Sequence, residues 1–137
     1  MSVKLTEKII GSAIEVHKEL GPGLLESIYE ECLTELLQDQ RLTTCRQIEI
    51  PIRFRDKILS QKYRADLVVN RQVPVEIKSF SELSPILEAL VLTYLKLSRL
   101  TLGLSINFNV PLLKPGIKRF TTQPTTKTNS VSSVSLW

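Results

Sequence analysis

With 137 residues, the chain has room for one compact domain and a single hydrophobic core. The longest apolar run, residues 89–97, is too short and too interrupted to cross a bilayer, and the N-terminal residues lack the charged, apolar and small-residue order of a signal peptide. We therefore expect a cytoplasmic protein without membrane contact. The two cysteines lie outside any CxxC motif, which argues against a disulfide framework and a zinc site of ordinary spacing.

The net charge of +4 is distributed unevenly along the chain. No acid follows Glu88, and the cations beyond it are Lys96, Arg99, Lys114, Lys118, Arg119 and Lys127. Because Lys and Arg displace counterions from a nucleic-acid backbone, this asymmetry favours a partner that carries phosphates. A basic surface that is merely solvated is the alternative interpretation.

Two amphipathic helices are predicted at the start of the chain. Apolar residues recur at helical spacing over 3–20, and Gly21 followed by Pro22 marks the end of this helix. A second helix is predicted from after Gly23 to about residue 40. Its acids crowd the first half, where the helix dipole favours negative charge.

A sheet is predicted to follow, because the period of the apolar residues changes to two after Thr44. The first four expected strands form a meander, and a fifth comes later; they are placed at 45–54, 57–61, 63–69, 73–78 and 101–108. Between the fourth and the fifth strand, Ser84 followed by Pro85 is typical of a helix N-terminus. The run 86–98 is apolar on most sides, as in a helix that lies across a sheet.

The chain is expected to form one domain over residues 1–120, followed by a tail over 121–137. The tail is rich in threonine and serine and has little to bury, so we expect it to be loosely ordered.

Three charged residues, Asp66, Glu76 and Lys78, interrupt two apolar strands. Side chains alternate across a strand, so Glu76 and Lys78 share one face while the apolar residues between them occupy the other. Whether Asp66 joins them depends on the hairpin register. A three-residue loop over 70–72 sets Asp66 directly opposite Glu76, whereas a two-residue loop would put them on opposite faces.

With the three-residue loop, two chemical interpretations remain open. Paired carboxylates are hard ligands for Mg²⁺ or Mn²⁺, and a metal held there can polarise a phosphodiester, while Lys78 orients the nucleophile or stabilises charge on phosphorus. The alternative is a cross-strand ion cluster on a solvated sheet face, made of Arg64, Asp66, Glu76 and Lys78.

Three separated motifs resemble a known family. The stretch "ADLVVNRQVPVEIK" is similar to the core motif of the PD-(D/E)XK nuclease superfamily. Within that superfamily, "GPGLLESIYEE" resembles the GxxExxY proteins through Gly23, Glu26 and Tyr29, and residues 92–119 resemble the end of the same domain. The resemblance implies an α/β fold with a restriction-endonuclease-like core, in which helices flank a mixed sheet of an antiparallel meander and a further strand.

The resemblance also implies roles for individual residues. Asp66 and Glu76 would bind the metal, Lys78 would be the catalytic lysine, and Glu26 would be a fourth catalytic residue, the acid contributed by the first core helix. For Glu26 the alternative is a glutamate that stabilises the helix N-terminus. Tyr29 is expected to pack in the core with its hydroxyl hydrogen-bonded. The single histidine, His17, is expected to bond the backbone at a helix end.

The function implied is that of a Mg²⁺- or Mn²⁺-dependent nuclease that cleaves DNA and leaves a 5′-phosphate, with RNA as another substrate. A homodimer would reach both strands of a duplex. Related nucleases place a glutamine four residues before a tyrosine in the helix after the lysine strand, and here that position is Leu90. The alternative is therefore a catalytically inactive module of the same fold that binds nucleic acid or dimerises.

Phosphates must reach the metal from the open side of the sheet, so cations are expected to surround the two carboxylates. The candidates for this ring of nucleic-acid-binding residues are Arg64, Lys114, Lys118 and Arg119.

Overall fold

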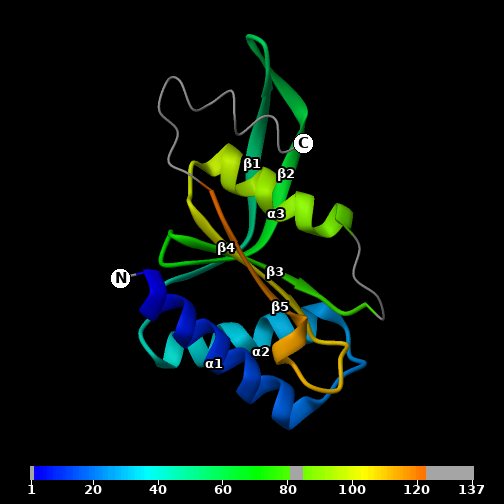
Figure 1. The fold of residues 1–137 in the computed structure, drawn as a ribbon. Helices are drawn as coiled ribbons and strands as arrows, with labels where there is room; N and C mark the ends of the chain where they lie inside the picture. Colours follow the sequence, from blue (N-terminus) through cyan, green and yellow to red (C-terminus); the bar gives the residue numbers. More distant parts are fainter. Residues whose placement is uncertain (1, 81–84, 123–137) are drawn as a thin grey trace.

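The computed structural model describes residues 2–80 and 85–122, in which helices cover both faces of one five-stranded sheet (Figure 1). The helices are α1 (Ser2–Leu20), α2 (Glu26–Asp39) and α3 (Pro85–Ser98). The strands are β1 (Thr44–Phe54), β2 (Lys57–Val69), β3 (Val73–Lys78), β4 (Leu102–Asn107) and β5 (Ile117–Thr121), the last preceded by a 3₁₀ turn, η1 (Lys114–Gly116). The strands lie in chain order, and β3 and β4 are parallel while every other pair is antiparallel.

This mixed sheet flanked by helices confirms the predicted fold class, with two differences in the strands. The segments expected as separate strands at 57–61 and 63–69 form the single strand β2. Lys62, the residue between them, does not end the strand, because this part of the hairpin is exposed and needs no buried face. Strand β5 was not predicted. Thr121, the first residue of the predicted tail, belongs to β5, and the Ser84 cap and residues 123–137 of that tail lie outside the described residues.

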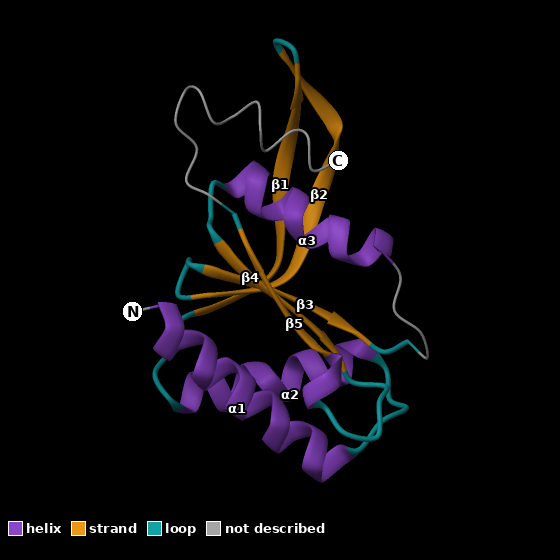
Figure 2. Cartoon of the chain, in the orientation of Figure 1, coloured by secondary structure: helices purple, strands orange, loops and turns teal. Residues whose placement is uncertain are grey.

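The two faces of the sheet carry different helices (Figure 2). Helices α1 and α2 pack on one face, where the core contains Val75 and Ile77 of β3 together with Leu104 of β4. Helix α3 crosses the other face, where Tyr94 packs against Val68 of β2. In the part of the chain that the structure describes, no helix is long and apolar enough to cross a membrane.

The loop after α1 is tied to α2 by Tyr29. The Tyr29 hydroxyl donates to the carbonyl of Gly21 at 2.5 Å and accepts from the Leu24 N–H at 3.1 Å. Its ring is fully buried and stacks on Phe108, with the ring centroids 4.3 Å apart. Tyr29 is therefore a packing residue with a bonded hydroxyl, as predicted.

His17 lies next to this loop and connects it to a distant segment. Its Nε2 donates to the carbonyl of Val110 at 2.8 Å. His17 thus bonds the backbone, as predicted, but the carbonyl belongs to the loop after β4 and not to the end of its own helix.

Asn107 at the end of β4 holds the segment that follows Lys78. Its amide group donates to the Phe80 carbonyl at 2.9 Å and accepts from the Phe80 N–H at 3.0 Å. The Phe108 N–H donates to the Lys78 carbonyl at 2.9 Å. The end of β4 and the residue after it therefore fix the backbone at Lys78 and Phe80, where β3 ends.

Replacing Gly116 with alanine tests how closely the chain packs behind Asn107. A Cβ at this position would lie 2.4 Å from the Asn107 carbonyl oxygen, so the backbone must shift, and we expect unfolding free energy to fall by about 2 kcal/mol. The matched control is Gly11→Ala in α1, where a Cβ meets nothing within 4 Å and helix propensity predicts a gain of roughly 0.5–1 kcal/mol. Urea unfolding measures both, and equal effects would contradict the packing argument.

Candidate active site

The hairpin between β2 and β3 has the predicted odd loop. Val69 pairs with Val73, and the register continues to Leu67 and Val75, so the next step along both strands places Asp66 opposite Glu76. The loop 70–72 includes Asn70 with a φ of 53°, a conformation that asparagine tolerates better than most residues. The predicted cross-strand relation of the two acids is therefore confirmed.

The regular backbone pairing of these strands ends at Leu67. Beyond it, the carboxylates of Asp66 and Glu76 bond the backbone of the opposite strand. The Ile77 N–H donates to Asp66 Oδ2 at 2.8 Å, and the Asp66 N–H donates to Glu76 Oε2 at 3.4 Å. Each carboxylate thus accepts a backbone N–H from the opposite strand. The acids are held where the strands separate, by bonds that replace the lost backbone ladder.

Lys78 stands beside this pair. Its Nζ lies 3.7 Å from Glu76 Oε1, and its side chain is 15% exposed. Both residues point to the same face of β3, as alternation requires. The arrangement therefore contains two carboxylates and one ammonium group. The side chain of Lys78 is more exposed than that of Glu76, which is 6% exposed.

Burial makes the charge of Glu76 unfavourable. The pKa of Glu76 is raised to about 8, first by burial and then by the neighbouring Asp66 carboxylate, while Lys78 opposes the shift only in part. The pKa of Tyr63 is raised above its usual range by burial and then by Glu76 and Asp66. Burial and Glu76 also raise the pKa of Tyr94. The surroundings of the two acids therefore have an excess of negative charge that a bound cation would neutralise.

The donor set fits a magnesium-type ion better than a softer metal. Both side chains offer hard carboxylate oxygens, and Mg²⁺ is commonly bound through one or two carboxylates, its other positions being taken by water and phosphate. Within residues 2–80 and 85–122, no group of three or more His, Cys, Asp or Glu residues is close enough to hold a metal. A site on Asp66 and Glu76 would thus leave positions for water and substrate.

Glu26 approaches the site strand from the first turn of α2. Its Oε2 accepts the N–H of Ser79 at 3.2 Å, and the Ser79 hydroxyl donates to the Leu24 carbonyl at 2.8 Å. Glu26 therefore holds the backbone of the residue after Lys78. It does not complete a group of three acids with Asp66 and Glu76 among the described residues.

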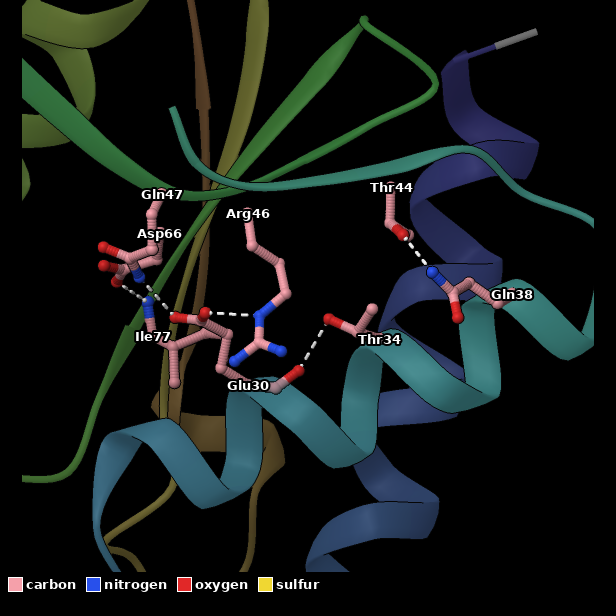
Figure 3. Close-up of polar contacts among 8 residues, drawn as sticks. All are labelled: Glu30, Thr34, Gln38, Thr44, Arg46, Gln47, Asp66 and Ile77. Carbon is pink, nitrogen blue, oxygen red and sulfur yellow. Dashed lines mark hydrogen bonds and ion pairs between the residues drawn. The ribbon is translucent and has the colours of Figure 1, made fainter. Parts of the chain in front are cut away.

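A further acid on α2, Glu30, was not predicted as part of the site. Glu30 is 5% exposed, and its carboxylate accepts Arg46 Nε at 2.7 Å and Gln47 Nε2 at 2.9 Å. Figure 3 shows Gln47 beside Asp66. The two residues lie opposite each other, because Arg46 pairs with Leu67 and Ile48 pairs with Ala65. Glu30 thus anchors β1 next to Asp66. The sequence carried no signal for this role, because the partners of Glu30 on β1 depend on how α2 packs.

Two of the four cations predicted to surround the carboxylates lie near α1 instead. Arg64 is exposed two residues before Asp66, and Lys118 lies on the Glu76 face of the sheet, where it forms an ion pair with Glu88 of α3. Arg119, being the next residue of β5, points to the opposite face. The prediction overlooked this alternation of side chains along a strand.

The other two members of the predicted ring contact α1. The Arg119 guanidinium donates to Thr6 of α1 at 3.3 Å. Lys114 lines a hollow with His17 and Lys18, at the C-terminal end of α1. Neither residue is therefore brought to the face that carries Glu76 and Lys78.

The site thus combines a buried Glu76, a half-buried Asp66 and a lysine where two strands of a mixed sheet separate. Residues 3–120 match the PD-(D/E)XK nuclease superfamily. Because the match covers most of the chain, the protein belongs to that superfamily.

Comparisons with curated proteins and with solved structures give no further information about activity. The search of curated proteins finds no match. Among solved structures, the crystal structure of SSO0001 is similar with a TM-score of 0.48 and 18% sequence identity, covering 80% of this chain and 55% of that one. The chain thus spans about half the length of that structure, and a likeness at this level carries no inference about activity.

The raised pKa of Glu76 predicts a pH-dependent stability that Glu76→Gln removes. Between about pH 4.5 and 8 the folded protein keeps a proton that the unfolded chain has released, so the free energy of unfolding falls as pH rises. In metal-free buffer the variant should gain roughly 2 kcal/mol over wild type between about pH 5 and pH 8. Urea unfolding at both pH values measures this gain.

The control for this experiment is Glu49→Gln on the exposed β1 edge, where the Glu49 side chain is 60% exposed. The difference between this variant and wild type should stay constant over the same pH range. A Glu76→Gln difference that is equally constant would show that burial does not disfavour the charge of Glu76.

Proposed function

We propose that this protein is a metal-dependent nuclease that hydrolyses phosphodiester bonds of DNA, leaving a 5′-phosphate, and that it is one of the GxxExxY proteins of its superfamily. The observation that carries the proposal is the pair Asp66 and Glu76, each bonded to the opposite strand, with Lys78 beside it. RNA is the alternative substrate. We expect a single nuclease domain over residues 1–120 that acts in the cytoplasm, as a homodimer when both strands of a duplex are cut.

Asp66 and Glu76 are the residues that would hold Mg²⁺ or Mn²⁺. When bound, such an ion supplies polarisation of a phosphodiester and a nucleophilic water at neutral pH. Asp66 keeps one oxygen on the Ile77 N–H, which holds its carboxylate against β3. Glu76 must lose its proton to act as a ligand, so higher pH favours metal binding up to about its pKa of 8.

Lys78 is the candidate catalytic residue of the reaction. Its ammonium group can donate to the attacking water or to a phosphate oxygen whose charge increases in the transition state. Glu76 lies 3.7 Å from the Lys78 Nζ, and Glu26 holds the backbone of the next residue at Ser79. Glu26 therefore acts as a positioning residue for Lys78 in this proposal.

One observation supports a second candidate function, a nucleic-acid-binding or dimerising module without catalysis. Leu90 occupies the helix position where related nucleases place a glutamine, and its carbonyl accepts the Tyr63 hydroxyl at 2.5 Å. This contact fixes α3 against β2 without offering a polar side chain to substrate. The two candidates agree on the fold and differ in whether a phosphodiester is cleaved.

Metal binding is tested by titrating Mn²⁺ into wild type and Asp66→Asn in a calorimeter. The asparagine oxygen can still accept the Ile77 N–H, so the fold is retained while the ligand loses its charge. We expect wild type to bind Mn²⁺ and the variant to bind at least about ten-fold more weakly. The control is Asp56→Asn in the exposed β1–β2 turn, which should bind as wild type does. Equal binding by all three proteins would remove the metal site.

Catalysis is tested with Lys78→Met, which retains the length of the side chain and removes the ammonium group. With Mg²⁺ or Mn²⁺, cleavage of single-stranded, nicked and branched DNA should fall by about 100-fold or more, while Mn²⁺ binding persists. Lys96→Met on the exposed side of α3 is the matched control and should cleave at the wild-type rate. Metal binding by wild type without any cleavage would favour the non-catalytic module.

A further inference from the structure

The hairpin formed by β1 and β2 extends beyond the sheet as an arm, which we define as residues 52–64. Figure 1 shows this hairpin rising past α3. The pairing shifts register between Pro51 and Arg53, so the arm begins at an irregularity of the ladder. Every residue over 53–62 is exposed. The strands of the arm therefore present both of their faces to solvent.

The arm is densely positive. It contains a single acid, Asp56, and five cations, namely Arg53, Arg55, Lys57, Lys62 and Arg64. Its net charge of +4 equals that of the whole 137-residue chain, so lysines and arginines balance acids in the remainder. A polyanion is thus attracted to the arm, where five cations lie within thirteen residues.

Exposed apolar side chains are interleaved with these cations. Phe54 is 58% exposed and Ile58 is 61% exposed. Phe54 pairs with Lys57 across the hairpin, and Arg53 pairs with Ile58, so each pair places a cation beside an apolar group. The Arg55 guanidinium also lies over the Phe54 ring, with its carbon 5.3 Å from the centroid. Such a surface offers contacts to both phosphates and bases.

The arm is continuous with the candidate active site through β2. Lys57 near the tip and Asp66 at the site belong to the same strand, nine residues apart, which corresponds to about 30 Å. This length matches about nine base pairs of B-form DNA, since successive pairs are about 3.4 Å apart. A duplex that presents a phosphate at Asp66 can therefore be contacted along its flank by the arm.

We propose that the arm binds in the major groove of duplex DNA beside the scissile phosphate. The B-form major groove admits a two-stranded β-ribbon, whereas the A-form groove of duplex RNA is too deep and narrow to be read. The cations contact the phosphates on both sides of the groove, and Phe54 and Ile58 contact apolar base edges. A second copy of the arm is a poor occupant, because two segments of net charge +4 repel each other.

The adjacency to a cut phosphate rests on the proposed nuclease function, whereas binding by the arm does not. The test is therefore a binding measurement, by fluorescence anisotropy of a duplex of about 20 base pairs, twice the reach of the arm. Ca²⁺ replaces Mg²⁺ so that DNA is not cleaved. The arm variant is Arg53→Gln, Arg55→Gln and Lys57→Gln together. The control variant changes three exposed lysines of α1 in the same way: Lys4, Lys8 and Lys18.

The arm variant should bind about 100-fold more weakly near 0.15 M salt, and its plot of log affinity against log salt should be shallower by about 2.7, or 0.9 for each lost phosphate contact. The control variant should keep the wild-type slope. Phe54→Ser should weaken binding several-fold at an unchanged slope, because it removes an apolar contact and no charge. Duplex RNA of the same sequence should bind more weakly than DNA.

Several outcomes would overturn the proposal. These are equal slopes for the arm and control variants, equal affinity for duplex RNA and DNA, or a wild-type dimer that the Phe54→Ser change converts to monomer with loss of binding. Cleavage activity, measured separately with Mg²⁺, keeps the two proposals distinct. Cleavage and binding that both survive the arm variant would refute the arm alone, whereas arm-dependent binding without cleavage would refute the nuclease function and retain the arm.

Discussion

The register of the β2–β3 hairpin is the constraint on which the candidate site depends. The three-residue loop over 70–72 pairs Val69 with Val73, and this choice alone brings Asp66 opposite Glu76. A shift of one residue would turn one of the acids to the other face of the sheet. The same register allows each carboxylate to accept an N–H from the opposite strand where the ladder ends. The same strand pairing therefore determines both the end of the backbone ladder and the position of the two acids.

Burying the charge of Glu76 destabilises the fold, and hydrogen bonds from neighbouring elements hold the strands of the site in place. Glu76 is buried beside a second acid, and Lys78 and the hydrogen bond from the Asp66 backbone offset the resulting rise of its pKa only in part. Two acids of helix α2 hold the strands of the site by hydrogen bonds. Glu26 holds the backbone after Lys78, and Glu30 holds Arg46 and Gln47 of β1. Carboxylates that bind no substrate thus position the strands on both sides of those that would bind a metal.

Much of this site could be predicted from sequence because it is local. Asp66, Glu76 and Lys78 lie within one hairpin, so loop length and alternation determine their relation. Glu30 could not be assigned in this way, since its partners on β1 are sixteen and seventeen residues away and depend on how α2 packs. Helix periodicity alone predicts a surface glutamate at such a position.

The charge pattern of the C-terminal part illustrates the same limit. Lys118 and Arg119 are adjacent in sequence, yet one lies near α3 and the other contacts α1, because β5 is a strand. The strand itself was not predicted. The arm was also missed, since a segment of alternating charged and apolar residues has the same pattern whether one face is buried or both are exposed.

The parallel pairing of β3 with β4 has a consequence for how the protein folds. Antiparallel neighbours such as β2 and β3 are joined by a short loop, whereas β3 reaches β4 only through the whole of α3. Closing that longer connection costs more chain entropy, so pairs such as Glu76 with Ser105 are non-local contacts that form slowly. The hairpin that carries both acids can form before β4 and β5 join the sheet. Because repulsion between two carboxylates is weakest in water, the pairing of these acids costs least while they are still hydrated.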